Sequence, residues 1–462
     1  MVTEPENTLT VPEKIQSVLS DDKTLFPYQI DDITKLTTEW KNKSVFLGLE
    51  MGLGKTIISI LTWEILKYEK ILIICPANVR FVWESEIREW SEGYKSFLYD
   101  IQTITKSNEK IITKPVFPII ITSYDLSIAP DIAQQLLSFD WDLIVFDECH
   151  CLGNPKSKRT KMCCGNLFKR SKRSLFLSGS IQRNRIINVW PVFRTLCPEK
   201  ISTFWKFAYR YNYIEQGEYG IKFLGGRNLE ELGKIATDNF LIRRKKAWVL
   251  KDLPEKIEQK IYITDEKIRA EIEKQSFLLG DELENSLLTT GVMSENLATL
   301  RRQIGEAKIP FVVDECLELL GLGSSEEGIN KLVVFCHHRS VFGKLQKELS
   351  KHVKVYGFLG GAGNEERRGN VERFQSGSFN EKSIFLGTFA AAEGITLTAA
   401  SHIVFAEMSW SLSQNEQAID RLHRIGQKNT VYIKYLLFKN SLDEIVYRVY
   451  KRKMVDKQKA FK

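Results

Sequence analysis

No apolar run in this 462-residue sequence is long enough to cross a bilayer, which takes roughly 18 consecutive residues. The first twenty residues carry Glu, Pro and Lys where a secretory signal needs an apolar stretch. These absences argue against a helical membrane protein. We expect an intracellular protein without a membrane partner.

The sequence also has no C-x-x-C pair among its eight cysteines, and several of these lie inside apolar segments. Together with the chain length, this excludes a small disulfide-stapled scaffold and indicates buried, reduced thiols. Cys149, His150, Cys151, Cys163 and Cys164 are close in sequence, but their spacing fits no common zinc pattern. We therefore expect no zinc site.

Acidic residues are missing from one long stretch of the chain. Between Cys151 and Arg185 there are ten Lys or Arg residues and no Asp or Glu, although the net charge of the whole chain is only +8. Such a stretch creates a local field that attracts polyanions. Charge alone leaves a solvated basic loop as an equal alternative.

The residues that are present indicate a globular α/β protein. Hydrophobic residues make up 43% of the chain, which is enough for substantial cores, and the length favours two or three domains of roughly 150 to 250 residues. Short runs rich in Ile and Val alternate with amphipathic stretches in both halves, a pattern typical of parallel sheets flanked by helices. The sequence therefore predicts two α/β units.

Ten segments are predicted to be buried strands. They are Val45–Leu49, Ile71–Cys75, Pro118–Ser123, Leu143–Asp147 and Ser174–Ser178 in the first half, and Lys331–Cys336, Lys354–Phe358, Ser383–Thr388, His402–Ala406 and Val431–Leu437 in the second. Helices are predicted over Thr56–Tyr68 and Val79–Trp90.

Two stretches break this rhythm and are predicted to be helical insertions, one near residues 200–240 and one near 265–325. The basic run Arg243–Lys246 and the Leu253-Pro254 break mark the junction of the halves. This reasoning divides the chain into an N-terminal extension (1–25), a first lobe (26–245), a linker (246–255) and a second lobe (256–462).

A glycine-rich segment follows the first strand and leads into a helical pattern. It includes Gly52, Gly54, Lys55 and Thr56. Glycines allow successive N–H groups and a helix N-terminus to face a phosphate, while the lysine reaches the β and γ phosphates and the threonine hydroxyl binds Mg²⁺. The spacing departs from the strict G-x-x-x-x-G-K-[ST] pattern, because Leu49 stands five residues before Gly54. The segment nevertheless predicts a phosphate loop.

Two carboxylates follow the strand Leu143–Phe146. Asp147 and Glu148 stand where this strand ends, the position at which α/β sheets place ligands. Asp147 is predicted to help hold Mg²⁺, and Glu148 to orient and deprotonate an attacking water. Beside a phosphate loop, this pair is better explained as a hydrolytic site than as an exposed acidic turn.

Two arginines near the end of the chain could complete such a site. Arg421 and Arg424 are spaced i and i+3, so on a helix their guanidinium groups would share one face and could reach a γ-phosphate across a cleft. An arginine of this kind contributes roughly 10³ to 10⁵ in rate. The alternative is a surface helix with ordinary salt bridges.

In this order, these motifs resemble those of superfamily-two helicases, and specifically the SWI/SNF-type DNA translocases. The resemblance covers about Phe26 to Tyr450, and the His-Arg-Ile-Gly-Gln ending of the motif Gln417–Gln427 is its most specific part. The segments around His337-His338 and Val404–Glu407, with Trp410, most resemble the annealing-helicase branch. His337 and His338 themselves are expected to be packing residues.

The resemblance implies two RecA-like lobes that sandwich ATP and Mg²⁺ and that both contact double-stranded or forked DNA, in a monomeric motor. It assigns Gln29 to adenine, near the Tyr28 ring, and Gly394 and Gln417 to the nucleotide. It also assigns a set of residues to DNA contact or to its coupling with hydrolysis: Lys156, Lys158, Arg159, Ser178, Ser180, Thr396 and Trp410. Trp410 has burial in the core as its alternative.

No departure from the family pattern removes a predicted phosphate, metal or arginine residue. Leu49 stands where the family usually has an acid, and Gly153, Ile181 and Ser411 replace the family's Lys, Pro and Asn-type positions. We therefore expect ATP hydrolysis. The departures at Gly153, Ile181 and Ser411 instead affect the expected DNA binding and its coupling to hydrolysis. Two other hypotheses are a strand-separating DNA or RNA helicase and a nucleic-acid-binding scaffold without turnover.

Overall fold

The computed structural model describes residues 10–19, 23–91, 100–112, 119–179, 181, 185–217, 220–266, 272, 295–322, 328–377, 381–391 and 394–460. The chain forms two compact units. The first comprises Met1–Tyr211 and Asn228–Val249, and the second comprises Asn212–Arg227 and Leu250–Lys462. Among the described residues, no helix is long and apolar enough to cross a membrane.

The first unit is built on a seven-stranded, fully parallel sheet in the order β3-β4-β2-β5-β6-β1-β9. Its central strands are continuous runs of buried apolar residues, as a sheet covered on both faces requires. The strands are β1 (Val45–Leu49), β2 (Ile71–Cys75), β3 (Ile101–Thr103), β4 (Ile119–Ser123), β5 (Trp141–Asp147), β6 (Ser171–Leu177) and β9 (Leu241–Arg244).

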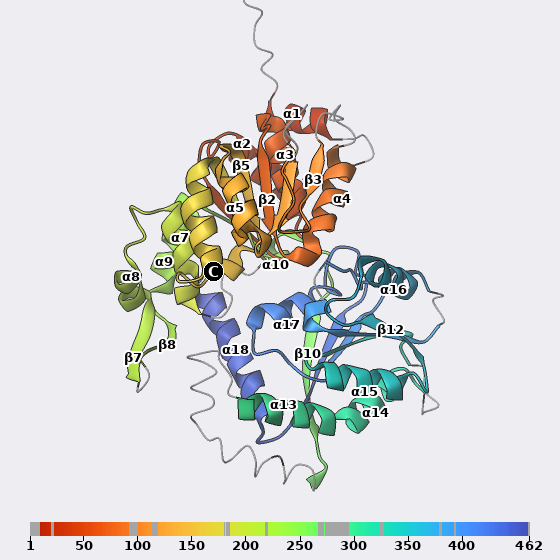
Figure 1. Cartoon of the computed structure of the whole chain (residues 1–462). Helices are drawn as coiled ribbons and strands as arrows, with labels where there is room; N and C mark the ends of the chain where they lie inside the picture. The colour runs from red at the N-terminus through yellow and green to blue at the C-terminus, as the bar shows by residue number, and fades with distance from the viewer. Residues whose placement is uncertain are drawn as a thin grey trace, which may run out of the picture. The chain divides into compact units, whose positions relative to one another are not determined.

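Helices flank this sheet (Figure 1). They are α1 (Val11–Val18), α2 (Pro27–Thr37), α3 (Lys55–Leu66), α4 (Arg80–Ser91), α5 (Pro130–Leu137), α6 (Lys158–Thr160), α7 (Trp190–Leu196), α8 (Phe204–Tyr211), α9 (Leu229–Asn239) and α10 (Lys246–Val249). Helix α3 packs against α2 and α4, so the helix after the glycine-rich segment belongs to the unit's core.

The second unit contains a six-stranded, fully parallel sheet in the order β10-β15-β14-β11-β13-β12. Its strands are β10 (Lys256–Ile263), β11 (Lys331–Cys336), β12 (Lys354–Phe358), β13 (Ser383–Thr388), β14 (His402–Phe405) and β15 (Val431–Phe438). Its helices are α13 (Glu295–Ala307), α14 (Ile309–Leu319), α15 (Arg339–Leu349), α16 (Asn364–Ser376), α17 (Leu412–Ile419) and α18 (Leu442–Ala460). The predicted pair of parallel α/β sheets is thus confirmed.

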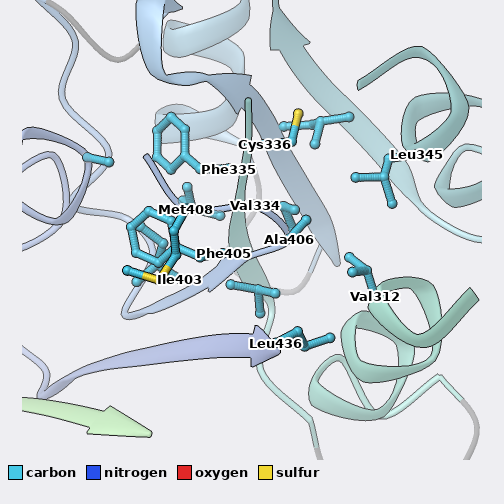
Figure 2. Packing of buried hydrophobic residues seen from close by; sticks show 14 of the residues in the cluster. Val312, Val334, Phe335, Cys336, Leu345, Ile403, Phe405, Ala406, Met408 and Leu436 are labelled. Carbon is cyan, nitrogen blue, oxygen red and sulfur yellow. The ribbon is translucent and has the colours of Figure 1, made fainter. Parts of the chain in front are cut away.

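The core of the second unit is a layer of apolar side chains on both faces of its sheet. Figure 2 shows Phe335 of β11 and Phe405 of β14 on one side, and Cys336 near Leu345 of α15 on the other. The Phe335 and Phe405 rings are stacked with centroids 6.3 Å apart. This packing fixes the carboxyl ends of neighbouring strands, where ligands bind in such sheets.

One predicted insertion is not purely helical. After α8, the chain forms an antiparallel hairpin of β7 (Asn212–Gly217) and β8 (Gly220–Gly226), and then continues into α9. The helix stops because Asn212–Gly226 combines Ile, Tyr and Phe, which favour strands, with four glycines, which favour turns over a helix. The prediction of a helical insertion near 200–240 is therefore corrected. In the insertion near 265–325, residues 267–271 and 273–294 lie outside the described residues.

Candidate ATP and nucleic-acid site

The glycine-rich segment forms a tight turn between β1 and α3. Gly52 and Gly54 have φ angles of 83° and 79°, a left-handed conformation that glycine adopts without strain. Helix α3 begins directly at Lys55, whose Nζ donates a hydrogen bond to the Leu49 carbonyl at 3.0 Å. The turn therefore presents a helix N-terminus and a lysine at the carboxyl end of β1, as a phosphate site requires.

Helix α2 contacts this turn through its first residues. The Gln29 side chain accepts a hydrogen bond from the Phe26 N–H at 2.9 Å, which caps the helix start. The Gln29 Nε2 and the Tyr28 hydroxyl both donate to the Leu53 carbonyl, at 3.5 and 3.2 Å. A Cβ atom on Gly54 would lie only 2.3 Å from Gln29 Nε2. The residue assigned to adenine thus lies directly on the phosphate loop.

Asp147 lies at the carboxyl end of β5 and is held by three neighbours. Its Oδ2 accepts a hydrogen bond from Trp83 Nε1 at 2.8 Å, its Oδ1 accepts one from the Glu148 N–H at 2.9 Å, and its carbonyl accepts one from the Tyr124 hydroxyl at 2.7 Å. Burial, together with the neighbouring Glu148, raises the pKa of Asp147 to about 6, although Trp83 and Lys55 lower it. A buried anion beside a lysine is suited to a divalent cation.

Glu148 adopts a left-handed backbone conformation, with φ 50°, that directs the chain away from β5. Its Oε2 lies 3.0 Å from His150 Nδ1 and 3.4 Å from the Ser178 hydroxyl, which in turn lies 3.1 Å from the same histidine nitrogen. Ser178 is fully buried. This burial argues against a direct contact of Ser178 with DNA, and its coupling of hydrolysis to DNA binding stays a prediction. Ser180 lies outside the described residues.

The loop after β6 closes this group of residues. A Cβ atom on Gly179 would lie 3.3 Å from the Met51 backbone nitrogen and 3.5 Å from Lys55 Nζ, so the loop lies against the glycine-rich turn. The carboxyl ends of β5, β6 and β1 are adjacent in the sheet. The structure thereby brings Lys55, Asp147, Glu148 and Ser178 to one edge of the first unit.

The donor set at this edge fits a magnesium nucleotide. The Asp147 carboxylate and the half-buried Thr56 hydroxyl are oxygen ligands, which Mg²⁺ prefers. Lys55 and the N-terminus of α3 supply positive charge and N–H groups for phosphates.

The two late arginines lie in the second unit, and their predicted helix is wrong. Helix α17 ends at Ile419, so Arg421 and Arg424 lie in the turns that follow. The segment leaves the helix because tighter hydrogen bonds take over, as from the Leu422 N–H to the Ile419 carbonyl. Gln417, the predicted nucleotide contact in α17, is half-buried.

Both arginines nevertheless donate hydrogen bonds to one loop, which contains Ile395 and Thr396. Arg421 is buried and donates through NH1 to the Ile395 carbonyl at 3.2 Å. Half-buried Arg424 donates through NH1 to the Thr396 hydroxyl at 2.8 Å. Gly394, which begins this loop, has a φ of 75° and is exposed. The structure therefore groups Gly394, Thr396, Arg421 and Arg424, although by a route other than a shared helix face.

His423 and Gln427, at the end of the motif Gln417–Gln427, stabilise the turn that carries the two arginines. Gln427 donates through Nε2 to the Ala400 carbonyl at 2.8 Å, and His423 Nε2 lies 2.8 Å from the Pro254 carbonyl. Both side chains are buried. His423 and Gln427 thus hold the segment that carries the arginines.

Comparisons with known proteins agree with this arrangement of motifs. A family model described as the SNF2-related domain matches residues 28–310, and one described as the helicase conserved C-terminal domain matches residues 312–426. The chain belongs to the SNF2-related family.

Relatives of this SNF2-related chain include a Caenorhabditis elegans homolog of the SWI/SNF-related matrix-associated actin-dependent regulator of chromatin subfamily A-like protein 1. It is 30% identical over 442 residues, which are 93% of this chain and 61% of the relative. The human DNA annealing helicase and endonuclease ZRANB3 is 29% identical over 93% of this chain and 40% of its own length. The chain thus spans less than two thirds of these relatives.

A solved structure, the Sulfolobus solfataricus SWI2/SNF2 ATPase core in complex with dsDNA, is also similar. It has 23% identity and a TM-score of 0.44, with coverage of 94% of this chain and 92% of that chain.

Trp410, a predicted DNA contact of the SNF2-related chain, is partly covered by a buried arginine. The Arg301 guanidinium of α13 lies 4.7 Å from the Trp410 ring centroid and donates to the Met408 carbonyl. The His337 ring lies 5.5 Å from Trp410. Trp410 is half-buried, so part of the ring stays accessible while the rest is packed.

Glu407 organises the strand ends beside Trp410. Its Oε2 accepts hydrogen bonds from the backbone N–H groups of His337 and His338, at 2.8 and 2.9 Å, and its Oε1 lies 2.6 Å from His338 Nδ1. Burial would raise the pKa of Glu407, but His338 and Arg301 lower it to about 2. The two histidines thus have a packing role at the end of β11. Arg301 was missed in the sequence because it lies on a charged helical stretch without a motif.

The basic stretch after Asp147 is exposed in part. Lys156 and Lys158 are exposed, whereas Arg159 forms an ion pair with Asp125 at 2.7 Å. The described part of the chain contains no cluster of three or more His, Cys, Asp or Glu side chains that could hold a metal ion, and all eight cysteines are free.

Proposed function

We propose that this chain is an ATP-driven motor that hydrolyses ATP with Mg²⁺ and translocates on double-stranded or forked DNA, remodelling it and reannealing its strands. The observation that carries this proposal is the meeting of Lys55, Asp147 and Glu148 at one sheet edge in an SNF2-related chain. The name of the human relative, a DNA annealing helicase, supports DNA as the substrate.

Each residue at this edge has a chemical role in the proposal. Lys55 and the glycine turn bind the phosphates, and Gln29 and Tyr28 bind adenine. Thr56 and Asp147 would hold Mg²⁺, which when bound would neutralise the negative charge that develops on the phosphates. Glu148 accepts a proton from the attacking water, and its contacts with His150 and Ser178 orient its carboxylate.

In the proposal, the second unit supplies the positive charge of Arg421 and Arg424. Arg424, with Arg421 behind it, stabilises the γ-phosphate in the transition state, assisted by Gly394 and Gln417 as nucleotide contacts. Because both arginines are fixed to the Ile395–Thr396 backbone and hydroxyl, contact of Thr396 with a DNA backbone would be linked directly to arginine placement. The lobe division 26–245 and 256–462, with 246–255 as the linker, stays part of the proposal, with the difference that Asn212–Arg227 belongs to the second compact unit.

The test compares ATP turnover with and without duplex DNA. We expect stimulation by DNA in the parent protein and losses of roughly 10² to 10⁴ for Lys55→Ala and Glu148→Gln and roughly 10³ for Arg424→Ala. Arg368→Ala is the matched control, because its side chain is 83% exposed and pairs with Glu372 on its own helix. Wild-type turnover in all three site variants would contradict these roles.

A second assay separates the kinds of motor. A duplex translocase displaces the third strand of a triplex yet leaves an ordinary duplex paired, whereas a strand-separating helicase opens a forked DNA or RNA duplex. DNA binding without any turnover would instead identify a scaffold.

A further inference from the structure

A buried ion pair joins the adenine helix to the edge of the first sheet. Arg244, in β9, donates from Nε and NH2 to Oδ1 of Asp32, in α2, at 3.0 and 2.6 Å. The Asp32 side chain is 1% exposed and that of Arg244 is 30% exposed. A carboxylate in this position depends on its arginine, because an unpaired buried charge is costly.

Asp32 lies one turn after the residues assigned to adenine. Tyr28 and Gln29 of the same helix both bind the Leu53 carbonyl of the phosphate loop. Burial and the nearby Asp32 charge raise the pKa of Tyr28 to about 12. Asp32 of the ion pair and the two residues assigned to adenine therefore lie on one helix, and that helix contacts the phosphate loop.

Two further bonds connect β9 back to the phosphate loop. The Glu50 N–H donates to the Arg244 carbonyl at 3.1 Å, and Glu50 Oε2 accepts a hydrogen bond from the Lys246 N–H at 2.9 Å. Lys246 begins α10, the last element of the first unit before the chain passes to Leu250. Helix α2, the phosphate loop and the β9–α10 segment thus form a closed ring of contacts.

We propose that Asp32 and Arg244 are positioning residues for recognition of the nucleotide base, which hold Tyr28 and Gln29 in register with the phosphate loop. Neither side chain needs to touch ATP. Because Gln29 bonds to the loop only through its amide, a shift of α2 along β9 would move the base contacts while leaving Lys55, Asp147 and Glu148 in place. This inference rests on the proposed function, since it assigns the base-binding part of the same site.

The experiment measures the KM and kcat for ATP and GTP in the parent protein and in Asp32→Asn. The variant keeps the size of the side chain but removes its charge. We expect the KM for ATP to rise about tenfold and the preference for ATP over GTP to fall by a similar factor, with the kcat at saturating ATP changed less than about twofold. Arg244→Lys keeps the charge but loses the fork of donors, and we expect a smaller shift in the same direction.

The matched control is Glu231→Gln, which breaks an Arg–carboxylate pair in the same unit. Arg210 donates to both Glu231 oxygens at 2.8 and 2.7 Å, but this pair is exposed and lies on α8 and α9. We expect no change in KM or base preference. If Asp32→Asn unfolds the protein, Arg244→Lys carries the test.

The outcomes separate the two proposals. A lower melting temperature in both ion-pair variants, with unchanged KM and ATP preference, would mean a structural role only and would overturn the inference. If the parent protein discriminates ATP from GTP, the proposed function stands whether or not the ion-pair variants change the KM and the ATP preference. A parent that binds neither nucleotide would overturn the proposed function and this inference together.

Discussion

Trp83 holds the carboxylate of Asp147, the residue that we propose as a Mg²⁺ ligand, without being a ligand itself. Its Nε1 donates to Asp147 Oδ2, so replacement by phenylalanine removes a bond that orients the carboxylate. We expect Trp83→Phe to need about tenfold more Mg²⁺ for half-maximal ATP turnover, because outer partners of metal ligands commonly affect metal affinity by 10- to 100-fold. The measurement is the Mg²⁺ dependence of ATPase activity.

Trp63 provides the control for this prediction. It is a second fully buried tryptophan, and its ring stacks on Trp83 with centroids 6.5 Å apart. Its Nε1 has no hydrogen-bond partner among the described residues. Trp63→Phe should therefore leave the Mg²⁺ dependence unchanged, and an equal shift in both variants would show that packing rather than the hydrogen bond matters.

At the scale of single residues, the sequence predicted those residues whose role is indicated by a motif and by their position after a strand. Lys55, Asp147 and Glu148 were found because they follow strands that end at the ligand edge of a parallel sheet. Trp83, Asp32 and Arg301 were not assigned roles, because their partners are distant in sequence. The bond from Trp83 to Asp147 spans 64 residues, and that from Arg244 to Asp32 spans 212.

At the scale of elements, helix α13 packs closely on the end of β14 because residue 305 is glycine. A Cβ atom there would lie 2.4 Å from Glu407 Oε1 and 3.0 Å from Val341 Cγ2. We expect Gly305→Ala to lower the free energy of unfolding by roughly 1 to 3 kcal/mol, because Glu407 is fixed by the histidines of β11 and cannot move away freely. Urea unfolding measures the change.

Gly343 supplies the opposite case. It lies in the interior of α15, and a Cβ atom there would have no neighbour within 4 Å. Gly343→Ala should raise the free energy of unfolding by about 0.5 to 1 kcal/mol, the usual gain when alanine replaces a helical glycine. If both variants were stabilised to the same extent, the close approach of α13 to Glu407 would have no energetic weight.

The elements that the sequence predicted well are those with a continuous apolar run. β1, β2, β11 and β13 have the predicted bounds, because interior parallel strands are buried on both faces. β12 also has the predicted bounds, although it is a partly exposed edge strand. The strands that were missed lie at sheet edges: β3 has three residues, β9 ends in Arg243-Arg244, and β10 mixes charged residues with Ile and Tyr. An edge strand obtains its stability from one neighbour, so its sequence carries a weaker pattern.

At the scale of the whole molecule, composition and alternation predicted two parallel α/β sheets, but not how the chain is shared between them. The segment Asn212–Arg227 belongs to the second unit, although the chain before and after it belongs to the first. Such an exchange depends on contacts between distant segments, for example between β8 and α18, and has no local sequence signal.

The charge of the molecule is distributed so that binding of DNA should depend on a few exposed lysines. Lys156 and Lys158 follow the acidic pair at the carboxyl end of β5, and both are exposed. Each lysine that neutralises a DNA phosphate contributes about 0.9 to the slope of log K against log salt concentration. For Lys156→Ala with Lys158→Ala, we therefore expect a slope shallower by about 1.8, with weaker binding to all duplex sequences.

Lys172 provides the control that separates DNA binding along Lys156 and Lys158 from a general effect of positive charge. It is also exposed, but it is the second residue of β6, at the opposite, amino end of the sheet, and pairs with Asp142 at 2.7 Å. Lys172→Ala should leave the slope of duplex binding unchanged, because a screened charge beyond a Debye length of roughly 8 Å contributes little at physiological salt. An equal decrease in slope for Lys172→Ala and for each single change at Lys156 and Lys158 would contradict a localised track, and DNA would then respond only to the net charge of the molecule.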